Sequence, residues 1–231
     1  MRSIKGLIVF LLLSRALFSS AQSDRIKVSI NLNISNNELI LSDTTGQMNE
    51  NTSFQIDVLK FYLSNFRFYK NDTLVFQEHN SFHLFDEAIP TTHHFIMENS
   101  ENTTYNKVVF NLGIDSITNV SGALGGALDP TNGMYWTWQS GYVNFKLEGR
   151  SNKSNTRNHE VQFHLGGYAS PNNSLQTITF NVKNLRDIKL VLDADNIFNN
   201  IDLTTQNHIM SPCKEAIKLS KIVAQSFSCN Q

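Results

Sequence analysis

Histidine is the residue type in this sequence with the clearest capacity for chemistry, because a neutral imidazole ring is a good ligand for copper and zinc. The chain has seven histidines, spread from His79 to His208. We therefore expect any metal site to be assembled from segments that are distant in the sequence. The strongest candidate is His164, in the segment Val161-Gln162-Phe163-His164-Leu165. Apolar and polar residues alternate there, so the His164 side chain is expected to point away from the core.

Two further histidines, His83 and His208, are the second candidates for metal ligands. His83 lies in Ser81-Phe82-His83-Leu84-Phe85-Asp86, and His208 lies in His208-Ile209-Met210. For each candidate, including His164, the alternative is a structural histidine or one on the polar surface. The remaining histidines are expected to be exposed to solvent: His79, His93, His94 and His159.

Both tryptophans, Trp136 and Trp138, lie two residues apart within residues 133–149. On an extended backbone their indoles project to the same side and form one aromatic wall. An intact indole has an N–H donor and no free lone pair in its plane, so it can offer a cation only its ring face. The alternative is a pair of aromatic residues that close the core. Met134 and Met210 are thioethers that could assist Cu(I), although methionine more often fills gaps in a core.

Four short motifs resemble the secreted bacterial family of MbnP-like copper-binding proteins. They are GMYWTWQSGY at residues 133–142, FHLGG at 163–167, YLSN at 62–65 and HIMSP at 208–212. The resemblance covers most of the chain after residue 21. It implies an exported, β-rich protein that binds copper, and it places His164 in the family's histidine–glycine motif.

The resemblance also implies a modified tryptophan. In copper-binding members a tryptophan of the motif is oxidised to kynurenine by a dihaem cytochrome-type oxidase, and the opened ring lies at the copper ion. Here we expect the modification at Trp136 rather than Trp138. One feature departs from the family, because those members carry a histidine in the loop before the motif, where this chain has LGGALDP at residues 124–130. His83 could substitute for that histidine from a neighbouring strand.

The elements that must position these residues are mainly β-strands. Alternation of apolar and polar residues is clearest at residues 26–34. Further strands are expected at residues 54–69, 74–77, 81–85, 105–113, 142–149, 160–165, 177–182 and 187–192. About nine short strands with polar turns predict an all-β fold, an antiparallel β-sandwich of Greek-key type. The glycine-rich residues 114–133 are expected to form a long loop that acts as a lid or a wall of the site.

A short C-terminal helix is expected over residues 214–225, between Cys213 and Cys229. Two cysteines in an exported chain often form a disulfide. However, a helix of this length separates its ends by ~18 Å, whereas the Cα atoms of bridged cysteines lie within ~7 Å. A folded-back bridge, free thiols and pairing with another chain all stay open.

The N-terminal residues 1–21 have the three parts of a secretory signal peptide. Arg2 and Lys5 form a basic start, residues 6–13 are apolar, and Ser19-Ser20-Ala21 is a small-residue exit. The apolar run is shorter than the ~20 residues of a membrane-spanning helix. We therefore expect cleavage after Ala21, one domain over residues 22–231, a periplasmic or secreted location, and no transmembrane segment in the mature chain.

Charge and motifs argue against several classes of function. The chain has 19 basic and 20 acidic residues and no basic run, which is unfavourable for binding nucleic acid. It lacks the nucleophile elbow, the phosphate loop, the Cys-x-x-Cys motif and the His-Glu-x-x-His motif, so we do not expect an enzyme. The function we expect is capture or delivery of copper by an exported protein. The alternative is a cell-envelope interaction module that binds carbohydrate or peptide through an aromatic surface, without metal.

Overall fold

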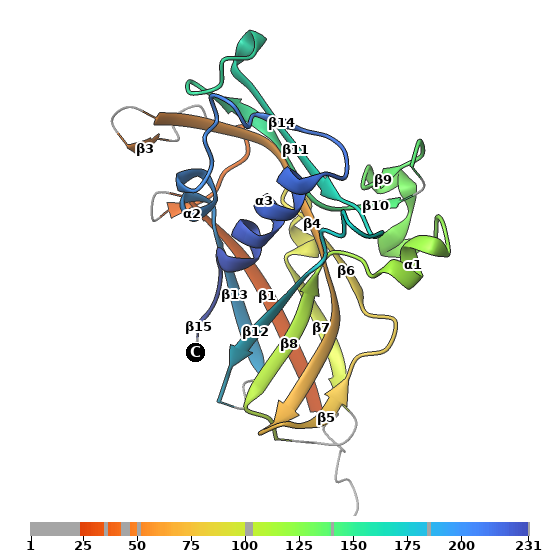
Figure 1. Ribbon diagram of the computed structural model, residues 1–231. Helices are drawn as coiled ribbons and strands as arrows, with labels where there is room; N and C mark the ends of the chain where they lie inside the picture. The colour runs from red at the N-terminus through yellow and green to blue at the C-terminus, as the bar shows by residue number, and fades with distance from the viewer. Residues whose placement is uncertain are drawn as a thin grey trace, which may run out of the picture.

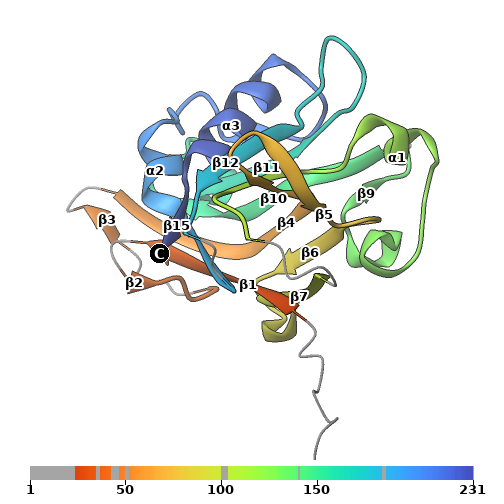
Figure 2. The same cartoon turned by 90° about the horizontal axis from the view of Figure 1, so that it is seen from below.

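Two β-sheets share one apolar core in the computed structural model, which describes residues 24–34, 37–42, 47–49, 52–99, 104–139, 141–183 and 186–230. Figures 1 and 2 show the sheets stacked, with α2 (Ala194–Asn199) and α3 (Lys214–Gln225) on one side. The helix α1 (Ser116–Val120) lies in a lobe at the opposite edge of the molecule, together with β9 (Tyr135–Trp136).

The smaller sheet has the strand order β15-β13-β1-β2, and β7 also pairs with β1. Its strands are β1 (Asp24–Ile34), β2 (Asn37–Glu38), β7 (His94–Asn99), β13 (Asp187–Asp193) and β15 (Phe227–Asn230). Four of the five apolar residues whose alternation predicts β1 are at most 2% exposed, and the fifth, Ile34, is partly buried. The four are Ile26, Val28, Ile30 and Leu32. Burial of one face explains why the period-2 pattern identified this strand.

The larger sheet has the order β12-β8-β4-β10-β11-β14, with β3, β5, β6 and β9 paired to its members. Its long strands are β4 (Thr52–Lys70), β10 (Gly141–Ser151) and β11 (Glu160–Gly166). The shorter ones are β3 (Gln47–Asn49), β5 (Thr73–Gln77), β6 (Phe82–Asp86), β8 (Lys107–Leu112), β12 (Gln176–Asn181) and β14 (His208–Ile209).

The long strand β4 pairs with two different strands along one edge. Residues 54–61 pair with β10, and residues 63–69 pair with β8. Within the second stretch Asn65 has a φ of 54°, and the register with β8 shifts between Ser64 and Arg67. Asparagine adopts this left-handed conformation more readily than most residues. The irregularity at Asn65 therefore interrupts the pairing of β4 with β8, after the change of partner from β10.

Aromatic side chains fill the space between the sheets. The Phe61 ring stacks on Phe85 with centroids 4.6 Å apart, and it meets Phe227 edge-on at 5.5 Å. The helix α3 packs against β11 and β12 and buries one face. That face consists of Ala216, Leu219, Ser220 and Val223. The expected boundaries of this helix are confirmed.

The all-β, sandwich-like class with a C-terminal helix is confirmed, but two expectations about its elements are wrong. The pairs β1–β13 and β11–β14 are parallel, so the sheets are mixed rather than purely antiparallel. Residues 114–133 are not an irregular loop, because they contain α1 and the short 3₁₀ helices η2 (Gly126–Leu128) and η3 (Pro130–Asn132). Two further 3₁₀ turns are η1 (Pro90–Thr92) and η4 (Arg157–His159).

Two further expectations concern a disulfide between the cysteines and a membrane-spanning helix. Cys213 and Cys229 are free thiols, and α3 stands between them. Within the described ranges, none of the helices has the length and apolar character needed to cross a bilayer. The expected signal peptide at residues 1–21 lies outside the described residues.

Candidate metal site

The strongest histidine candidate, His164, lies on the face of the larger sheet that is turned away from the main core. Its neighbours on β11 that are buried in that core are Val161, Phe163 and Leu165. His164 alternates with them, as the sequence predicts. Across the sheet His164 pairs with Lys146 on β10, and Lys146 pairs with Lys60 on β4. We call the side that carries this row of three residues the outer face.

The His164 ring is held in place by Glu148, which comes from β10. Its Nε2 atom lies 2.7 Å from Glu148 Oε1, and the residue is only 9% exposed. Burial lowers the pKa of His164 below its ordinary value of 6.5, against the opposing effect of the Glu148 hydrogen bond. The neutral ring donates its Nε2 proton to the carboxylate. The other ring nitrogen, Nδ1, then carries a lone pair that can bind a metal ion.

Glu148 is ionised in this arrangement. Burial by itself would raise the pKa of Glu148, but hydrogen bonds from His164 and Lys146 hold it below its ordinary value of 4.5. The Lys146 Nζ atom lies 3.1 Å from Glu148 Oε1. A carboxylate that accepts the second ring N–H of a histidine is the usual outer partner of a metal-binding histidine, since it fixes the ring and its tautomer.

Trp136 packs over Gly166, which lies two residues after His164 on β11. A Cβ atom built on Gly166 would lie 2.6 Å from Cζ3 and 2.9 Å from Cη2 of the Trp136 ring. Gly166 follows His164 by two residues on β11, so the two share a face with Cα atoms ~7 Å apart. Glycine at this position leaves room for the indole next to the histidine.

The two tryptophans are in contact but have different environments. Their ring centroids lie 5.6 Å apart at an angle of 44°. Trp136 is 7% exposed, whereas Trp138, in the turn after β9, is 64% exposed. The expected aromatic wall is therefore a pair with one ring inside the protein and one at its surface.

Met134 and Trp136 belong to a second apolar cluster, which lies on the outer face. Its other buried members are Tyr62, Ile114, Leu128, Tyr142 and Val143. Met134 is fully buried in this cluster, as expected of a methionine that fills a gap in a core.

His83 lies on the opposite side of the sheet from His164. It pairs with Leu63, which is buried in the main core, and its ring stacks on Phe95 with centroids 3.5 Å apart. Its Nε2 atom lies 2.9 Å from Glu78 Oε2. The register of β4 with β6 and β10 places Lys60 and Leu63 on opposite faces, so the structure does not bring His83 and His164 together.

His208 lies on the same side as His164. It pairs with Gln162, two residues before His164, and its charge contributes to lowering the His164 pKa. Met210 is one residue beyond the end of β14, so the parallel register carries it toward the level of His164. Among the described residues there is no group of three or more His, Cys, Asp or Glu side chains that could hold a metal ion. Any metal here would therefore depend on fewer such ligands or on other donors.

The segment before the tryptophans is fastened to the outer face by three side chains. The Lys60 Nζ atom donates to Asn132 O at 3.2 Å, and the Tyr62 hydroxyl donates to Ala127 O at 3.0 Å. Lys146 Nζ lies 3.4 Å from Gly133 O. The segment therefore covers part of the outer face, and its backbone carbonyl groups accept these three bonds.

Sequence reasoning did not identify Glu148, Lys146 or Gly166 as parts of this site. The alternation in β10 does place Lys146 and Glu148 on its polar side, and Gly166 is part of the FHLGG motif. The sequence pattern does not show the pairing of β10 with β11. That pairing places His164 opposite Lys146 and diagonal to Glu148.

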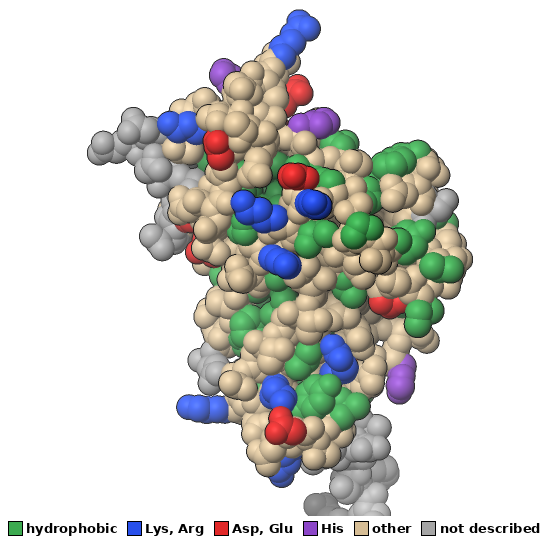
Figure 3. Space-filling view, in the orientation of Figure 1, with side chains coloured by type: hydrophobic (Ala, Val, Ile, Leu, Met, Phe, Trp, Pro, Cys, Tyr) green, Lys and Arg blue, Asp and Glu red, His purple; other side chains and the backbone are tan. Residues whose placement is uncertain are grey.

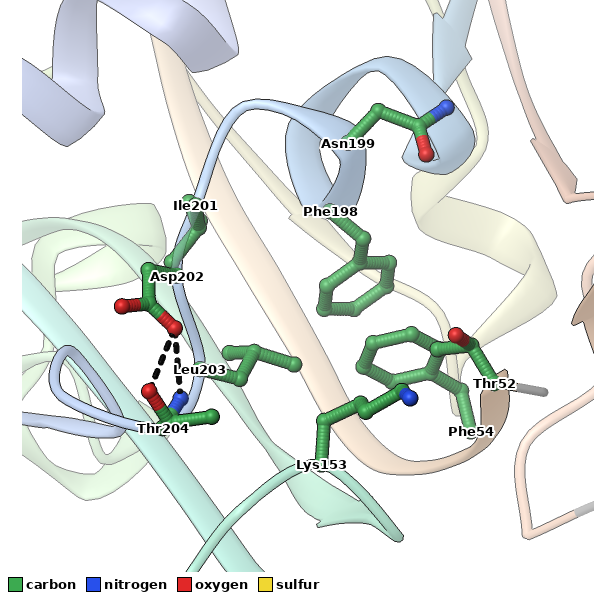
Figure 4. Close-up of a pocket in the computed structure, with 9 residues that line it drawn as sticks. All are labelled: Thr52, Phe54, Lys153, Phe198, Asn199, Ile201, Asp202, Leu203 and Thr204. Atoms are coloured by element: carbon green, nitrogen blue, oxygen red, sulfur yellow. Dashed lines mark hydrogen bonds between the residues drawn. The ribbon is translucent and has the colours of Figure 1, made fainter.

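A separate pocket of about 260 Å³ lies away from these residues (Figure 4). Its apolar side is formed by Phe54 and Phe198, whose rings stack at 3.7 Å. Asp202 at its rim accepts hydrogen bonds from the backbone and hydroxyl of Thr204, so its carboxylate stabilises its own turn. None of the histidines or tryptophans predicted for the site lines this pocket.

The protein is therefore a β-sandwich-like protein in which a buried histidine is bonded to a carboxylate. A tryptophan packs on the glycine two residues after that histidine. The chain belongs to the MbnP family, whose family model matches residues 23–212. Its fold is similar to the solved structure of MbnP from Methylosinus trichosporium. The TM-score is 0.58 with 13% sequence identity, and the match covers 82% of each chain. No curated protein sequence matches this chain.

Proposed function

We propose that this protein is an exported copper-binding protein that captures or delivers copper outside the cytoplasm, and that it is not an enzyme. The observation that carries the proposal is His164. Its ring is buried and neutral, and Glu148 holds it through Nε2 at 2.7 Å, so Nδ1 keeps a lone pair that can bind a metal ion. Membership of the MbnP family supports the same assignment.

The donors near His164 suit a soft copper ion better than a harder metal. His208 lies on the same face and offers a second imidazole, and Met210 offers a thioether. Imidazole and thioether are ligands that copper accepts, and Cu(I) tolerates a low coordination number. The lack of a third His, Cys, Asp or Glu ligand in the described residues fits Cu(I) better than a four-coordinate zinc site.

We further propose that Trp136, rather than Trp138, is the residue that a dihaem cytochrome-type oxidase would convert to kynurenine. Trp136 packs on Gly166 beside His164, whereas Trp138 lies at the surface. Ring opening adds two oxygen atoms and removes one carbon with one oxygen, which leaves an amine and a carbonyl as new donors. Mass spectrometry of the peptide covering residues 133–146 from the native host tests this. An unmodified peptide in copper-loaded protein would refute it.

Titration of the protein with Cu(I) against a competing chelator tests the proposed function. His164→Ala should weaken binding at least tenfold, and His83→Ala is the matched control because His83 lies on the opposite face. Unfolding curves of both variants establish that each is folded at the titration temperature. Equal affinity in the wild-type protein and His164→Ala would rule out this assignment.

A further inference from the structure

The lobe at residues 114–139 carries an exposed apolar surface that neither the core nor the proposed copper site uses. Four of the eight large hydrophobic side chains exposed in the described part of the chain belong to it. They are Ile117 (83% exposed), Val120 (73%), Leu124 (40%) and Trp138 (64%). Figure 3 shows hydrophobic side chains gathered on this side of the molecule, over α1 and β9. We call these four residues the apolar tip.

The helix α1 exposes its apolar residues and buries a polar one, so the exposure is part of the fold. Ile117 and Val120 are three residues apart, so they share one face of the helix, and that face is in solvent. The residue it buries is Asn119, which is 2% exposed. A surface helix normally buries its apolar face, so this arrangement calls for a partner outside the chain.

The surroundings of the apolar tip are almost free of charge. From residue 116 to residue 145 the sequence has a single charged residue, Asp129. The Asp129 carboxylate accepts hydrogen bonds from the backbone and hydroxyl of Thr131, at 2.8 and 2.6 Å. Asp115, just before α1, likewise accepts hydrogen bonds from the backbone and hydroxyl of Thr118, and so caps the helix. Two further titratable residues, Glu78 and His79, border the tip, because they line the same surface hollow as Ile117. Glu78 is bonded to Ser81 and His83. The segment itself offers a partner no lysine or arginine.

Hydrogen bonds hold the helix and the loop of the apolar tip on the rest of the protein. Asn119 donates to Ile114 O at 3.0 Å and accepts from Tyr142 N at 2.8 Å. The Tyr142 hydroxyl accepts from Leu124 N at 3.0 Å and donates to Gly122 O at 3.2 Å. These bonds fix both the helix and the loop that follows it, so the apolar side chains are presented in place before any partner binds.

The size and shape of this surface favour a lipid layer over a second protein. A stable protein–protein interface buries ~800 Å² on each partner, whereas a large aromatic side chain contributes only ~150–250 Å² and an aliphatic one less. Four side chains therefore fall short of a stable dimer interface. The segments that carry them are a short helix, a loop and a turn, and the ribbon places this lobe at the edge of the molecule (Figures 1 and 2). An exposed apolar group at an edge can enter a deformable layer.

We propose that the apolar tip docks this protein reversibly on the surface of a lipid bilayer with neutral, zwitterionic headgroups. Trp138 would lie at the headgroup level, where the amphipathic indole is favoured, with Ile117 and Val120 reaching the acyl boundary. Because the tip has no lysine or arginine, anionic lipid adds no attraction. This inference does not depend on copper binding.

The test is co-sedimentation of the copper-free protein with phosphatidylcholine vesicles, together with tryptophan emission. We expect binding that is unchanged by 0.5 M salt or by added phosphatidylglycerol. We also expect a blue shift of the emission, with quenching by brominated acyl chains. Trp138→Phe should remove the shift, because Trp136 is already buried.

The matched pair of variants is Ile117→Asp and Ile40→Asp. Both isoleucines are exposed, at 83% and 66%, but Ile40 lies outside the apolar tip. Ile117→Asp should weaken binding to vesicles at least tenfold, and Ile40→Asp should not. Absence of vesicle binding by the wild-type protein overturns the proposal. The proposal is also overturned if sedimentation velocity shows self-association that Ile117→Asp abolishes, and the wild-type protein does not bind vesicles.

Discussion

Replacing Gly166 by alanine is the sharpest perturbation of the contact between β11 and Trp136. The new Cβ would lie 2.6 Å from Trp136 Cζ3 and 2.6 Å from the Tyr142 carbonyl oxygen. Carbon atoms in contact prefer ~3.5–4.0 Å, so the indole or the strand must move by about 1 Å. The carbonyl belongs to the backbone of β10 and cannot simply rotate away.

The expected cost of Gly166→Ala follows from two opposing effects. Overpacking of a filled site typically costs ~1–3 kcal/mol. Replacing glycine by alanine recovers ~0.4–1 kcal/mol by restricting the unfolded chain. The free energy of unfolding should therefore fall by roughly 1–2 kcal/mol, which for a domain of this size lowers Tm by ~2–4 °C per kcal/mol. Displacement of Trp136 should also weaken copper binding at His164.

Chemical denaturation, followed by tryptophan emission and circular dichroism, measures this effect. The control is Gly125→Ala, because Gly125 has φ −95° and ψ −175° and a Cβ there meets no atom within 4 Å. We expect Gly125→Ala to be as stable as the wild-type protein or slightly more stable. If Gly166→Ala matched Gly125→Ala in stability and kept the native emission spectrum, the packing of Trp136 on Gly166 would be refuted.

Three further predictions concern His164, Tyr62 and the cysteines. The folded-state pKa of His164 is lowered, so the neutral ring stabilises the fold above about pH 6.5, and this contribution is lost as the pH falls through the folded pKa. Denaturation at pH 5–7.5 should show the wild-type protein losing stability on acidification relative to His164→Gln; parallel curves would contradict this. Tyr62→Phe should cost ~0.5–1.5 kcal/mol in thermal or chemical unfolding, because the hydroxyl bonds to Ala127 O in a buried cluster. Reducing agent should leave Tm unchanged, since Cys213 and Cys229 are free, and a thiol reagent should titrate two groups after unfolding; a Tm that drops on reduction would reveal a disulfide.

The sequence predicts those parts of the fold whose pattern is local. β1 and α3 have clear periods of two and of about three and a half residues, and both lie where the pattern places them. β7 and β15 were not expected, because each is a short strand that forms only by pairing with a distant one. The helix α1 escaped prediction because its apolar residues face solvent and its buried residue is polar, which reverses the usual signal.

The candidate site shows the same division between local and distant information. Alternation within β11 was sufficient to place His164 on the side opposite the buried residues. It could not show that His83 lies on the other side of the sheet, since that depends on the register between β4, β6 and β10. The role of Glu148 likewise requires the β10–β11 pairing, which no sequence period encodes.

The central claim is that Nδ1 of His164 binds copper on the outer face. Crystals of the copper-loaded protein, measured at the copper absorption edge, test it most directly. The account predicts an anomalous peak at bonding distance from His164 Nδ1, on the outer face next to Gly166, with Nε2 still bonded to Glu148. A peak bonded to Nε2, or one at His83 with none at His164, would contradict it.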